Sequence, residues 1–467
     1  MSYIVKRRVG KHVYAYEVVS VWDKEKKMPV QRTIRYLGPV DDRGEIRERL
    51  KRPLRVLDYG DVVAAKHIFD RTPLPTLIER LPFGNNEKQL IELMVLNRVV
   101  APLPDYLLRD WVEGNYLSRL YGINLDSREI SRSLARIGRK DLAEIYLEIV
   151  KDVVRIKHVV AYDLTDLPTA VDLILSDWGR SGNGASKLIK LAVLFDVGSK
   201  VPLYFRLITG NVKGVSTLTG ILEQIRASLG RNVKFCMILD REFYSAANLR
   251  LMRKARMDFV IPVPRTTKFF QRMIKKSKNI LRAKNQFLLN GKYHYGLKFK
   301  VGALFAYVCY SPQKLSHDIE TLNRRAKLEG FDEAEFDERL DLAGYTVIVS
   351  TLDVEPREIL KRYYQRYYLE RSYSYLKSKV NLLPLRHHSE ETTLAHVFIS
   401  VLSLALYWII HERLGGKYSM HHAFLILRRV KAKVYDEDRV FPTEIGKRER
   451  EILGLLDVNL VSKICGK

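Results

Sequence analysis

Cysteine is scarce in this sequence: its 467 residues include three, Cys236, Cys309 and Cys465. They lie far apart and form no C-x-x-C pair, which argues against a zinc site or a disulfide framework and fits a reducing cytoplasm. The first residues, MSYIVKRRVGKHVYAYEV, lack the long apolar stretch of a secretory signal. We find no internal repeat and no low-complexity tract.

The sequence has one long hydrophobic run, from Leu394 to Ile410. It is slightly shorter than the ~20 apolar residues that a bilayer-spanning helix needs, and it contains His396, Ser400 and Ser403. A helix buried against a sheet explains these features better. We therefore expect no membrane partner.

Acidic residues are outnumbered: 54 Asp and Glu stand against 80 Lys and Arg, which gives a formal net charge of +26 and a pI near 9.7. This excess suits a polyanionic partner, and nucleic acid is favoured over an anionic membrane surface. The alternative is a ribosome-like binder with no chemistry. A hydrophobic fraction of 46% excludes wholesale disorder, and the length allows roughly three domains.

Residues 1–40 are predicted to be a small β unit, with two β-rich runs around the polar loop DKEKKMP. Its basic edge, Lys6, Arg7, Arg8 and Lys11, either contacts a DNA backbone or is a solvated strand face. Residues 41–155 are predicted to be helical, with apolar residues at three- and four-residue spacing. In that segment LDSREISRSLARIG permits a helix-turn-helix, and ordinary bundle packing is the alternative.

The rest of the chain changes between strand and helix patterns. Residues 156–264 alternate β-rich runs with helices, which predicts a mixed α/β domain, and the apolar run KFCMILD fits a central strand. Residues 265–342 are predicted to be an inserted basic and β-rich domain. Residues 343–415 complete the α/β domain and contain one long helix, EPREILKRYYQRYYLERSYSYLKSK. Residues 416–467 are predicted to be a C-terminal helical tail.

Three acids are candidates for chemistry. Asp163 ends the strand HVVAYD and Asp240 ends KFCMILD, and ligands gather beyond the carboxyl ends of sheet strands. The third acid, Glu370, shares one stripe of the long helix with a phenol, a guanidinium and an ammonium, those of Tyr363, Arg366 and Lys377. Such a stripe suits a metal beside a phosphate, and a solvated charged face is the alternative.

The pattern YYQRYYLERSYSYLK resembles the Tyr-Arg-Glu-Lys signature of a branch of DDE transposases from prokaryotic insertion sequences. YDLT and LDREFYS look like that family's first and second acidic motifs. LITGNVKGVSTL and LPLRHHSEETTLAHVFISVLSLAL resemble its intervening and following segments. The resemblance covers most of the chain, most tightly residues 158–410.

The resemblance implies a ribonuclease-H-like catalytic fold in which Asp163, Asp240 and Glu370 hold two Mg²⁺ or Mn²⁺ ions. It implies phosphodiester cleavage at insertion-sequence ends and transfer of the 3′-hydroxyls to target DNA. The partners would be double-stranded terminal inverted repeats and target DNA, with residues 41–155 binding the ends, a homodimer in the active complex, and a cytoplasmic, nucleoid-associated location. The predicted DNA contacts are Tyr363, Arg366, Lys377, Lys268, Arg272, Lys275, Lys276 and Lys278.

The sequence departs from the family pattern at the second motif, where Glu242 replaces the glycine of D-R-G and adds an acid near the expected metals. Asp166 is a rival to Asp163 as the first ligand, and Asp163 is preferred because it directly ends the apolar strand. Two other functions stay open: a catalytically silent DNA-binding protein descended from a transposase, and a ribonuclease-H-like nuclease without strand transfer. His387 and His388, in a polar loop, are expected to be solvated or to face phosphate.

Overall fold

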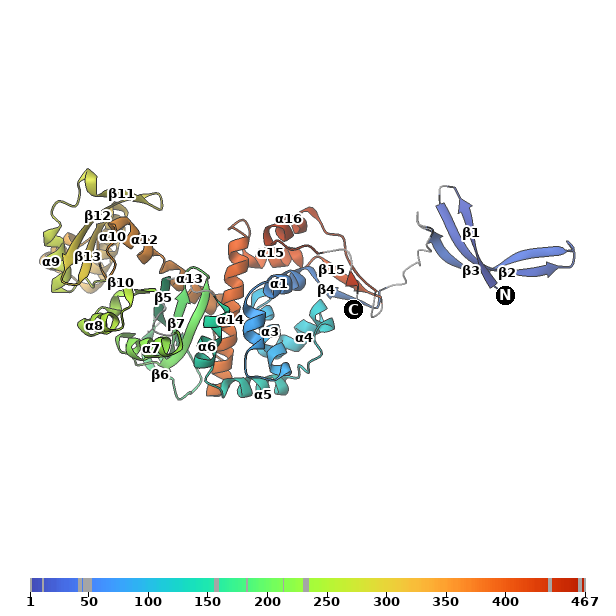
Figure 1. Cartoon of the computed structure of the whole chain (residues 1–467), viewed down its shortest axis with the longest axis horizontal. Helices are drawn as coiled ribbons and strands as arrows, with labels where there is room; N and C mark the ends of the chain where they lie inside the picture. Colours follow the sequence, from blue (N-terminus) through green and yellow to red (C-terminus); the bar gives the residue numbers. More distant parts are fainter. Residues whose placement is uncertain are drawn as a thin grey trace.

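The computed structural model describes residues 2–10, 12–40, 44, 53–154, 159–181, 184–212, 214–229, 235–435, 439–460 and 464–465. Three sheets and the helices around them make up this part of the chain, and Figure 1 shows their arrangement. The largest sheet and a group of N-terminal helices lie on opposite sides of one long helix, α14 (Glu390–Arg413), in Figure 1.

Residues 2–40 form a three-stranded antiparallel sheet that lies apart from the other elements in Figure 1. Its strands are β1 (Ser2–Val9), β2 (His12–Asp23) and β3 (Met28–Val40). The turn between β2 and β3 falls at Lys24–Lys27, within the polar loop that the sequence predicts.

The next segment is mainly helical, and its apolar faces are buried. Its elements are β4 (Arg55–Asp58), α1 (Gly60–Asp70), α2 (Leu74–Glu79), α3 (Asn85–Val100), the 3₁₀ turn η1 (Asp105–Leu107), α4 (Leu108–Glu113), η2 (Tyr116–Arg119), α5 (Ser127–Gly138) and α6 (Leu142–Val153). Asp126 caps α5 by accepting a hydrogen bond from the backbone N–H of Arg128. Helix α5 packs against α3 and α14, so this segment is arranged as a bundle.

The central sheet has ten strands in the order β11-β12-β13-β14-β10-β9-β5-β7-β6, with β8 paired to β7. Its first part comprises β5 (Val159–Pro168), β6 (Asp177–Ser181), β7 (Gly184–Asp196), β8 (Val201–Thr209), β9 (Cys236–Leu239) and β10 (Asp258–Pro262). The pairs β5–β9 and β9–β10 are parallel and the other pairs are antiparallel. Every residue of β9 is buried, as its continuous apolar sequence predicts. This confirms the predicted mixed α/β fold.

Helices α7 (Gly214–Leu229) and α8 (Ala246–Lys254), and the 3₁₀ turn η3 (Arg241–Phe243), connect these strands. They supply the crossovers that two parallel neighbours require. Ser245 caps α8 by accepting from the backbone N–H of Asn248.

Residues 265–342 do not form a sheet of their own. They contain α9 (Lys268–Lys276), η4 (Ala283–Asn285), β11 (Gln286–Leu289), β12 (Lys292–Val301), β13 (Leu304–Tyr310), α10 (Pro312–Glu329) and α11 (Glu333–Asp341). Strand β13 pairs with β14 (Tyr345–Ser350), which itself pairs with β10. The inserted strands therefore extend the central sheet, because the free edge of β14 offers backbone groups for pairing.

The predicted single long helix is divided into α12 (Pro356–Tyr364) and α13 (Tyr367–Ser378). At the break the backbone N–H groups of Gln365 and Arg366 bond to residues three positions earlier, Arg362 and Tyr363, at 3.0 and 3.1 Å. Such 3₁₀ bonds tighten the chain locally, and mid-helix tightening often marks functional positions. Regular 3.6-residue periodicity continues across the break, so the sequence pattern does not reveal it.

Helix α14 (Glu390–Arg413) contains the long hydrophobic run. It is long and apolar enough to cross a membrane, with a window of mean hydropathy 2.0, yet 89% of that window is buried inside the protein. Phe398 stacks on Phe205 of β8 at 5.8 Å between ring centroids, and Tyr146 of α6 contacts Phe398 edge to face. The helix is apolar on all sides because the sheet and the bundle both cover it.

The predicted C-terminal helical tail is wrong in part. Residues from 416 contain α15 (Met420–Leu427), β15 (Lys431–Val434), β16 (Arg439–Pro442), α16 (Lys447–Leu456) and β17 (Ile464–Cys465). The strands join β4 in a sheet of order β17-β16-β15-β4. The pairing of β15 with β4 joins segments from opposite ends of the sequence, and short strands of this kind gain their stability from such partners.

Candidate active site

Asp163 and Asp240 lie next to each other where β9 ends. Strands β5 and β9 are parallel neighbours, and their register pairs Tyr162 with Leu239. The next residue after each of these two is an aspartate, so the hydrogen-bonded register itself brings the two carboxylates together. Asp240 follows the carboxyl end of β9, the position where ligands of α/β sheets bind. Asp163 lies inside β5, opposite Val193 of β7, so the prediction that it ends its strand is wrong: pairing with β7 continues the strand to Pro168.

Helix α13 brings Glu370 to the same place. One turn after Glu370, the Tyr373 hydroxyl donates a hydrogen bond of 2.5 Å to the backbone carbonyl of Asp163. On the same helix the Ser372 hydroxyl accepts a hydrogen bond of 2.8 Å from the indole N–H of Trp408, on α14. These two contacts fix α13 between the strand and the core helix. The sequence analysis did not identify Tyr373, since a buried tyrosine on a helix has no distinctive pattern.

One guanidinium contacts all three carboxylates. Arg366 lies 2.7 Å from Asp240 (Nη1 to Oδ1), 3.3 Å from Asp163 (Nη2 to Oδ2) and 3.2 Å from Glu370 (Nη2 to Oε1). A single planar group can reach the three acids only if they converge. The acids that the sequence selected at widely separated positions therefore form one cluster, with Arg366 at its centre.

The cluster is graded from buried to open. The side chains of Asp163, Asp240 and Glu370 are 11%, 23% and 53% exposed. Asp163 Oδ1 accepts from the backbone N–H of Leu164 at 2.9 Å, and Asp240 Oδ1 accepts from that of Arg241 at 2.6 Å. Each aspartate is thus oriented by a backbone hydrogen bond. The greater exposure of Glu370 leaves the cluster open to solvent on that side. Carboxylate oxygens are the donors that hard divalent cations prefer, so these residue types suit a divalent metal. With Arg366 between them, the three acids do not bring ligand oxygens within 4.8 Å of one another, as Asp105, His387 and His396 do among the described residues.

The site carries more negative charge than Arg366 neutralises. Burial raises the pKa of Asp163, Arg366 opposes that shift, and the net pKa is about 6. Burial and the adjacent Asp240 also raise the pKa of Glu242, the middle residue of η3. Carboxyl groups held near one another favour the binding of an additional cation.

The sequence from residue 155 to residue 406, more than half of the chain, matches the family described as Transposase DDE domain. The chain belongs to this family. All three converging carboxylates lie within the matched region, and DDE transposases are enzymes that depend on such acids and on divalent metal ions.

A search of curated proteins gave no match to this transposase. Among solved structures, the piggyBac transposase synaptic complex with hairpin DNA is 10% identical, with a TM-score of 0.42, and the match covers 85% of this chain and 79% of that one. The Drosophila P element transposase strand transfer complex is 11% identical, with a TM-score of 0.24, covering 73% of this chain and 84% of that one.

The two acids that complicate the motifs of the transposase have different surroundings. Asp166 lies three residues after Asp163 on β5, so the two side chains project from opposite faces of the strand. In the register Asp166 is opposite Lys190 of β7, whereas Asp163 contacts Arg366. Lys190 is close enough to Glu242 to offset part of the rise in the pKa of that carboxyl. Lys190 is a second residue that the sequence analysis did not identify.

The predicted phosphate contacts lie on both sides of the break between α12 and α13. Tyr363 lies in the last turn of α12 and is half-buried, and burial raises the pKa of its phenol. Lys377 is in the last turn of α13, where burial lowers its pKa and Asp166 partly offsets the change. The prediction that these residues form one stripe on a single straight helix is therefore wrong. Arg366 and Glu370 do lie next to each other.

The predicted basic contacts gather on α9 and just after it. Lys268, Arg272, Lys275, Lys276 and Lys278 are all exposed, while Phe270 and Met273 of the same helix are buried. Helix α9 is amphipathic and packs its apolar side on the inserted strands. Its outward face thus carries exposed basic side chains.

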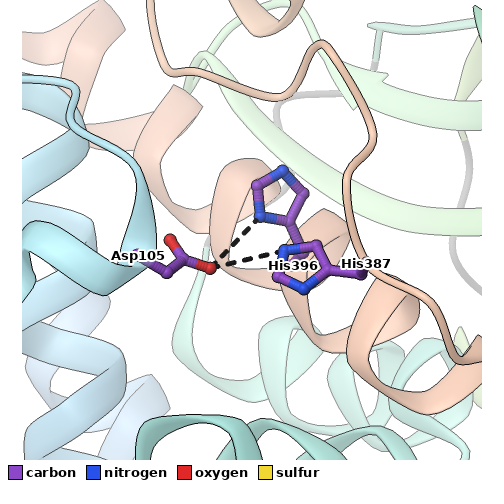
Figure 2. A group of neighbouring side chains, drawn as sticks. All are labelled: Asp105, His387 and His396. Atoms are coloured by element: carbon purple, nitrogen blue, oxygen red, sulfur yellow. Dashed lines mark ion pairs between the residues drawn. The ribbon is translucent and has the colours of Figure 1, made fainter. Parts of the chain in front are cut away.

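A buried polar cluster links the helical segment to α14, and Figure 2 shows three of its members. Asp105 Oδ2 lies 3.4 Å from His387 Nε2 and 3.8 Å from His396 Nδ1. The buried guanidinium of Arg98 lies 2.7 Å from His396 Nδ1 and also donates to the Ser400 hydroxyl at 2.8 Å. Burial and the neighbouring Arg98 lower the pKa of His396 to about 4, so this imidazole is neutral.

Arg98 provides positive charge to this cluster, and within the described residues the buried Asp105 Oδ2 has no hydrogen-bond partner. With a neutral ring, His396 Nδ1 accepts from Arg98 while Nε2 donates to the Leu382 carbonyl at 3.2 Å. The guanidinium supplies the cation that Asp105 requires, at 3.7 Å. We interpret the cluster as a polar connection between the helical segment and α14. His387 thus faces the protein interior, and the prediction of a solvated or phosphate-facing side chain is wrong for it.

Proposed function

We propose that this transposase cleaves phosphodiester bonds at the ends of a mobile DNA element and transfers the freed 3′-hydroxyls to target DNA. The observation that carries the proposal is the convergence of Asp163, Asp240 and Glu370 on one guanidinium. Two carboxylates from neighbouring central strands and one from a facing helix suit metal-assisted phosphoryl chemistry.

In this proposal the three carboxylates hold two divalent cations, Mg²⁺ or Mn²⁺, since an all-oxygen donor set disfavours zinc. When bound, such a pair of ions supplies activation of the attacking oxygen and charge stabilisation at the leaving oxygen. Asp163 is positioned by its strand and by the Leu164 N–H, and Asp240 by the Arg241 N–H. Rigid placement of acids on a sheet favours catalysis, because reacting groups are held in the correct geometry beforehand.

Arg366 has two roles in the proposal. Its guanidinium offsets the negative charge of the three carboxylates. The same planar set of donors can bind a phosphate through two hydrogen bonds. Tyr363 and Lys377 would flank the phosphate, Lys377 as a point charge. The buried Arg366 Nε has no hydrogen-bond partner within the described residues, which leaves a donor for such a ligand.

The partners follow from the same proposal. Double-stranded DNA would lie along the basic face of α9, and residues 41–155 would bind the terminal inverted repeats. Two ends brought together would require a homodimer in the active complex. The branch with the Tyr-Arg-Glu-Lys signature is part of this proposal, and matching inverted repeats in the DNA flanking the gene would support it.

Replacing Glu370 with Gln should abolish Mg²⁺-dependent cleavage of end-containing DNA, because the amide cannot supply the negative charge that a divalent ion needs. Binding to the same DNA in EDTA should stay close to that of the wild type. Glu358→Gln, on the neighbouring helix α12, is the matched control and should cleave normally. Normal cleavage by Glu370→Gln would overturn the assignment.

Two alternative functions give different results in the same assay. A catalytically silent DNA-binding protein would bind DNA with no cleavage in Mg²⁺ or Mn²⁺ by the wild type. A nuclease without strand transfer would cut the end but yield no joined product with a supplied target duplex. A product of joined end and target, lost in Glu370→Gln, would support the transposase proposal against both.

A further inference from the structure

The strands β2 and β3 extend beyond β1 as a two-stranded arm. Pairing of β1 ends at Ser2 with Val19, whereas β2 and β3 remain paired from Ser20 with Gln31 to Asp23 with Met28. We call residues 20–31 the β arm. Figure 1 shows it projecting away from the other elements. At ~3.4 Å per residue, its four paired positions span roughly 13 Å.

The tip of the β arm is basic and its turn is locally fixed. Lys24, Lys26 and Lys27 are all exposed. The Asp23 carboxylate accepts hydrogen bonds from the backbone N–H groups of Glu25 and Lys26, at 3.0 and 3.1 Å. Asp23 therefore serves the turn, and Glu25 is the acid left beside three lysines.

The arm also exposes large apolar side chains. Trp22 is 62% exposed, and Val21 and Met28 are exposed as well. Trp22 and Val21 are consecutive on β2, so they project from opposite faces, and the arm shows an apolar side chain on each. Exposed apolar groups beside a cluster of like charges mark a binding element rather than a packing element.

Charge identifies the partner. The described part of residues 2–40 contains eight Lys and Arg, and its acids are Glu17, Asp23 and Glu25. Glu17 is already paired with Arg35 at 2.8 Å. A second copy of the same tip would be repelled, whereas a polyanion would be attracted. The major groove of duplex DNA, about 12 Å wide, admits a two-stranded β ribbon.

We propose that the β arm enters a groove of duplex DNA, with Lys24, Lys26 and Lys27 on phosphates and with Trp22 on one face of the ribbon and Met28 on the other against the two groove walls. This inference rests on the proposed function, because it assumes that the protein acts on DNA. Phosphate contacts carry no sequence information directly, so the arm supplies affinity for any duplex sequence.

The first test measures binding of the full chain to a duplex of arbitrary sequence in EDTA, over a range of salt concentrations. The triple variant K24Q/K26Q/K27Q should bind less tightly, and its log–log salt slope should fall by up to about 3, since each phosphate contact contributes ~0.9. The charge-preserving variant K24R/K26R/K27R should keep the wild-type slope, and Glu25→Gln should bind more tightly. An unchanged slope in the glutamine variant, or an equal loss in the arginine variant, would overturn the proposal.

The second test places Trp22 in the complex. Acrylamide should quench the fluorescence of free wild-type protein strongly and that of the DNA complex less. Trp178 is also exposed, so the variant Trp22→Phe is needed as the reference. The protection by DNA should largely disappear in that variant, and protection of equal size in both proteins would count against a groove contact by Trp22.

These results are separable from the proposed function. If Glu370→Gln abolishes cleavage while the arm variants bind DNA like the wild type, the transposase proposal stands and the arm inference fails. If the full chain binds no duplex DNA even at low salt, the DNA function itself fails. Circular dichroism of the arm variants should match the wild type, because the substituted lysines lie on an exposed turn.

Discussion

Arg366 shows how much one side chain can determine at the scale of residues. It lies between three acids whose mutual repulsion it offsets, at 16% side-chain exposure. Its loss would leave Asp163, which is almost buried, without a partner of opposite charge. The acids would then depend on solvent or on a bound cation.

We expect Arg366→Gln to lower the free energy of unfolding in EDTA at pH 8 by about 1–3 kcal/mol, the usual cost of losing charged hydrogen bonds. Added Mg²⁺ should recover part of this loss, because a divalent cation can balance the same carboxylates. Arg366→Lys keeps the charge but not the fork, so its loss should be smaller. Urea unfolding curves with and without Mg²⁺ check this, and a Gln variant as stable as the wild type in EDTA would contradict it.

His396 gives a pH dependence at the same scale. Its pKa of about 4 in the folded protein lies below the ordinary value of about 6.5 in the unfolded chain. The unfolded state therefore binds the proton more readily, so the stability that neutral His396 contributes is complete above about pH 6.5 and is lost as the pH falls to 4.

The expected loss over that window is about 3 kcal/mol. Thermal or urea unfolding of the wild type and of His396→Gln at several pH values measures it, and the difference between them should change over the window. His388→Gln is the control, because His388 is exposed. Parallel pH profiles for the wild type and His396→Gln would show that this ring is not the titrating group.

At the scale of elements, the packing of α5 on α14 depends on a close backbone approach. A Cβ placed on Gly138, the last residue of α5, would lie 1.8 Å from the carbonyl oxygen of Glu391. Backbone atoms cannot yield as a flexible side chain can. The glycine thus sets how near the bundle lies to the core helix.

Gly138→Ala should lower the free energy of unfolding by about 1–3 kcal/mol, because the helices must separate to admit the methyl group. Gly454, within α16, has open space around its Cβ position, so Gly454→Ala should be neutral or stabilising by about 0.4–1 kcal/mol. Denaturant unfolding of both variants provides the comparison. Equal effects at the two positions would mean that the α5–α14 contact is looser than described.

At the scale of the whole molecule, the net charge of +26 is distributed over surfaces that are far apart in the chain. The basic face of α9 lies in the inserted segment, and the β arm lies in the N-terminal sheet. DNA that contacted both would be held at two places by counterion release. The affinity of the full chain for duplex DNA should accordingly fall steeply with salt.

Lys275→Gln, Lys276→Gln and Lys278→Gln together should reduce the salt slope by up to about 3. If the α9 face and the β arm bind the DNA independently, combining this set with the β arm variant should give the sum of the two reductions. Fluorescence anisotropy of a labelled duplex at several salt concentrations measures the slope. A slope unaffected by the α9 substitutions would exclude this face as a DNA contact.

Local patterns in the sequence determined much of this protein. The apolar run of β9 predicts a buried strand, the run of α14 predicts a buried helix, and Asp240 follows its strand where ligands collect. These features depend on neighbours a few residues away, so a linear pattern contains them. The resemblance to DDE transposases grouped Asp163, Asp240 and Glu370 into one site. The family match covers the region that contains them, and their catalytic roles stay a proposal.

Tertiary structure alone decided the rest. The convergence on Arg366 depends on the register of β5 with β9 and on the Tyr373 bond, both of which join distant parts of the chain. The extension of the central sheet by β11–β13, and the pairing of β15 with β4, depend on the partner that an open strand edge finds. Hydrogen bonding and packing between distant segments have no periodicity in the sequence, and so no local pattern could predict them.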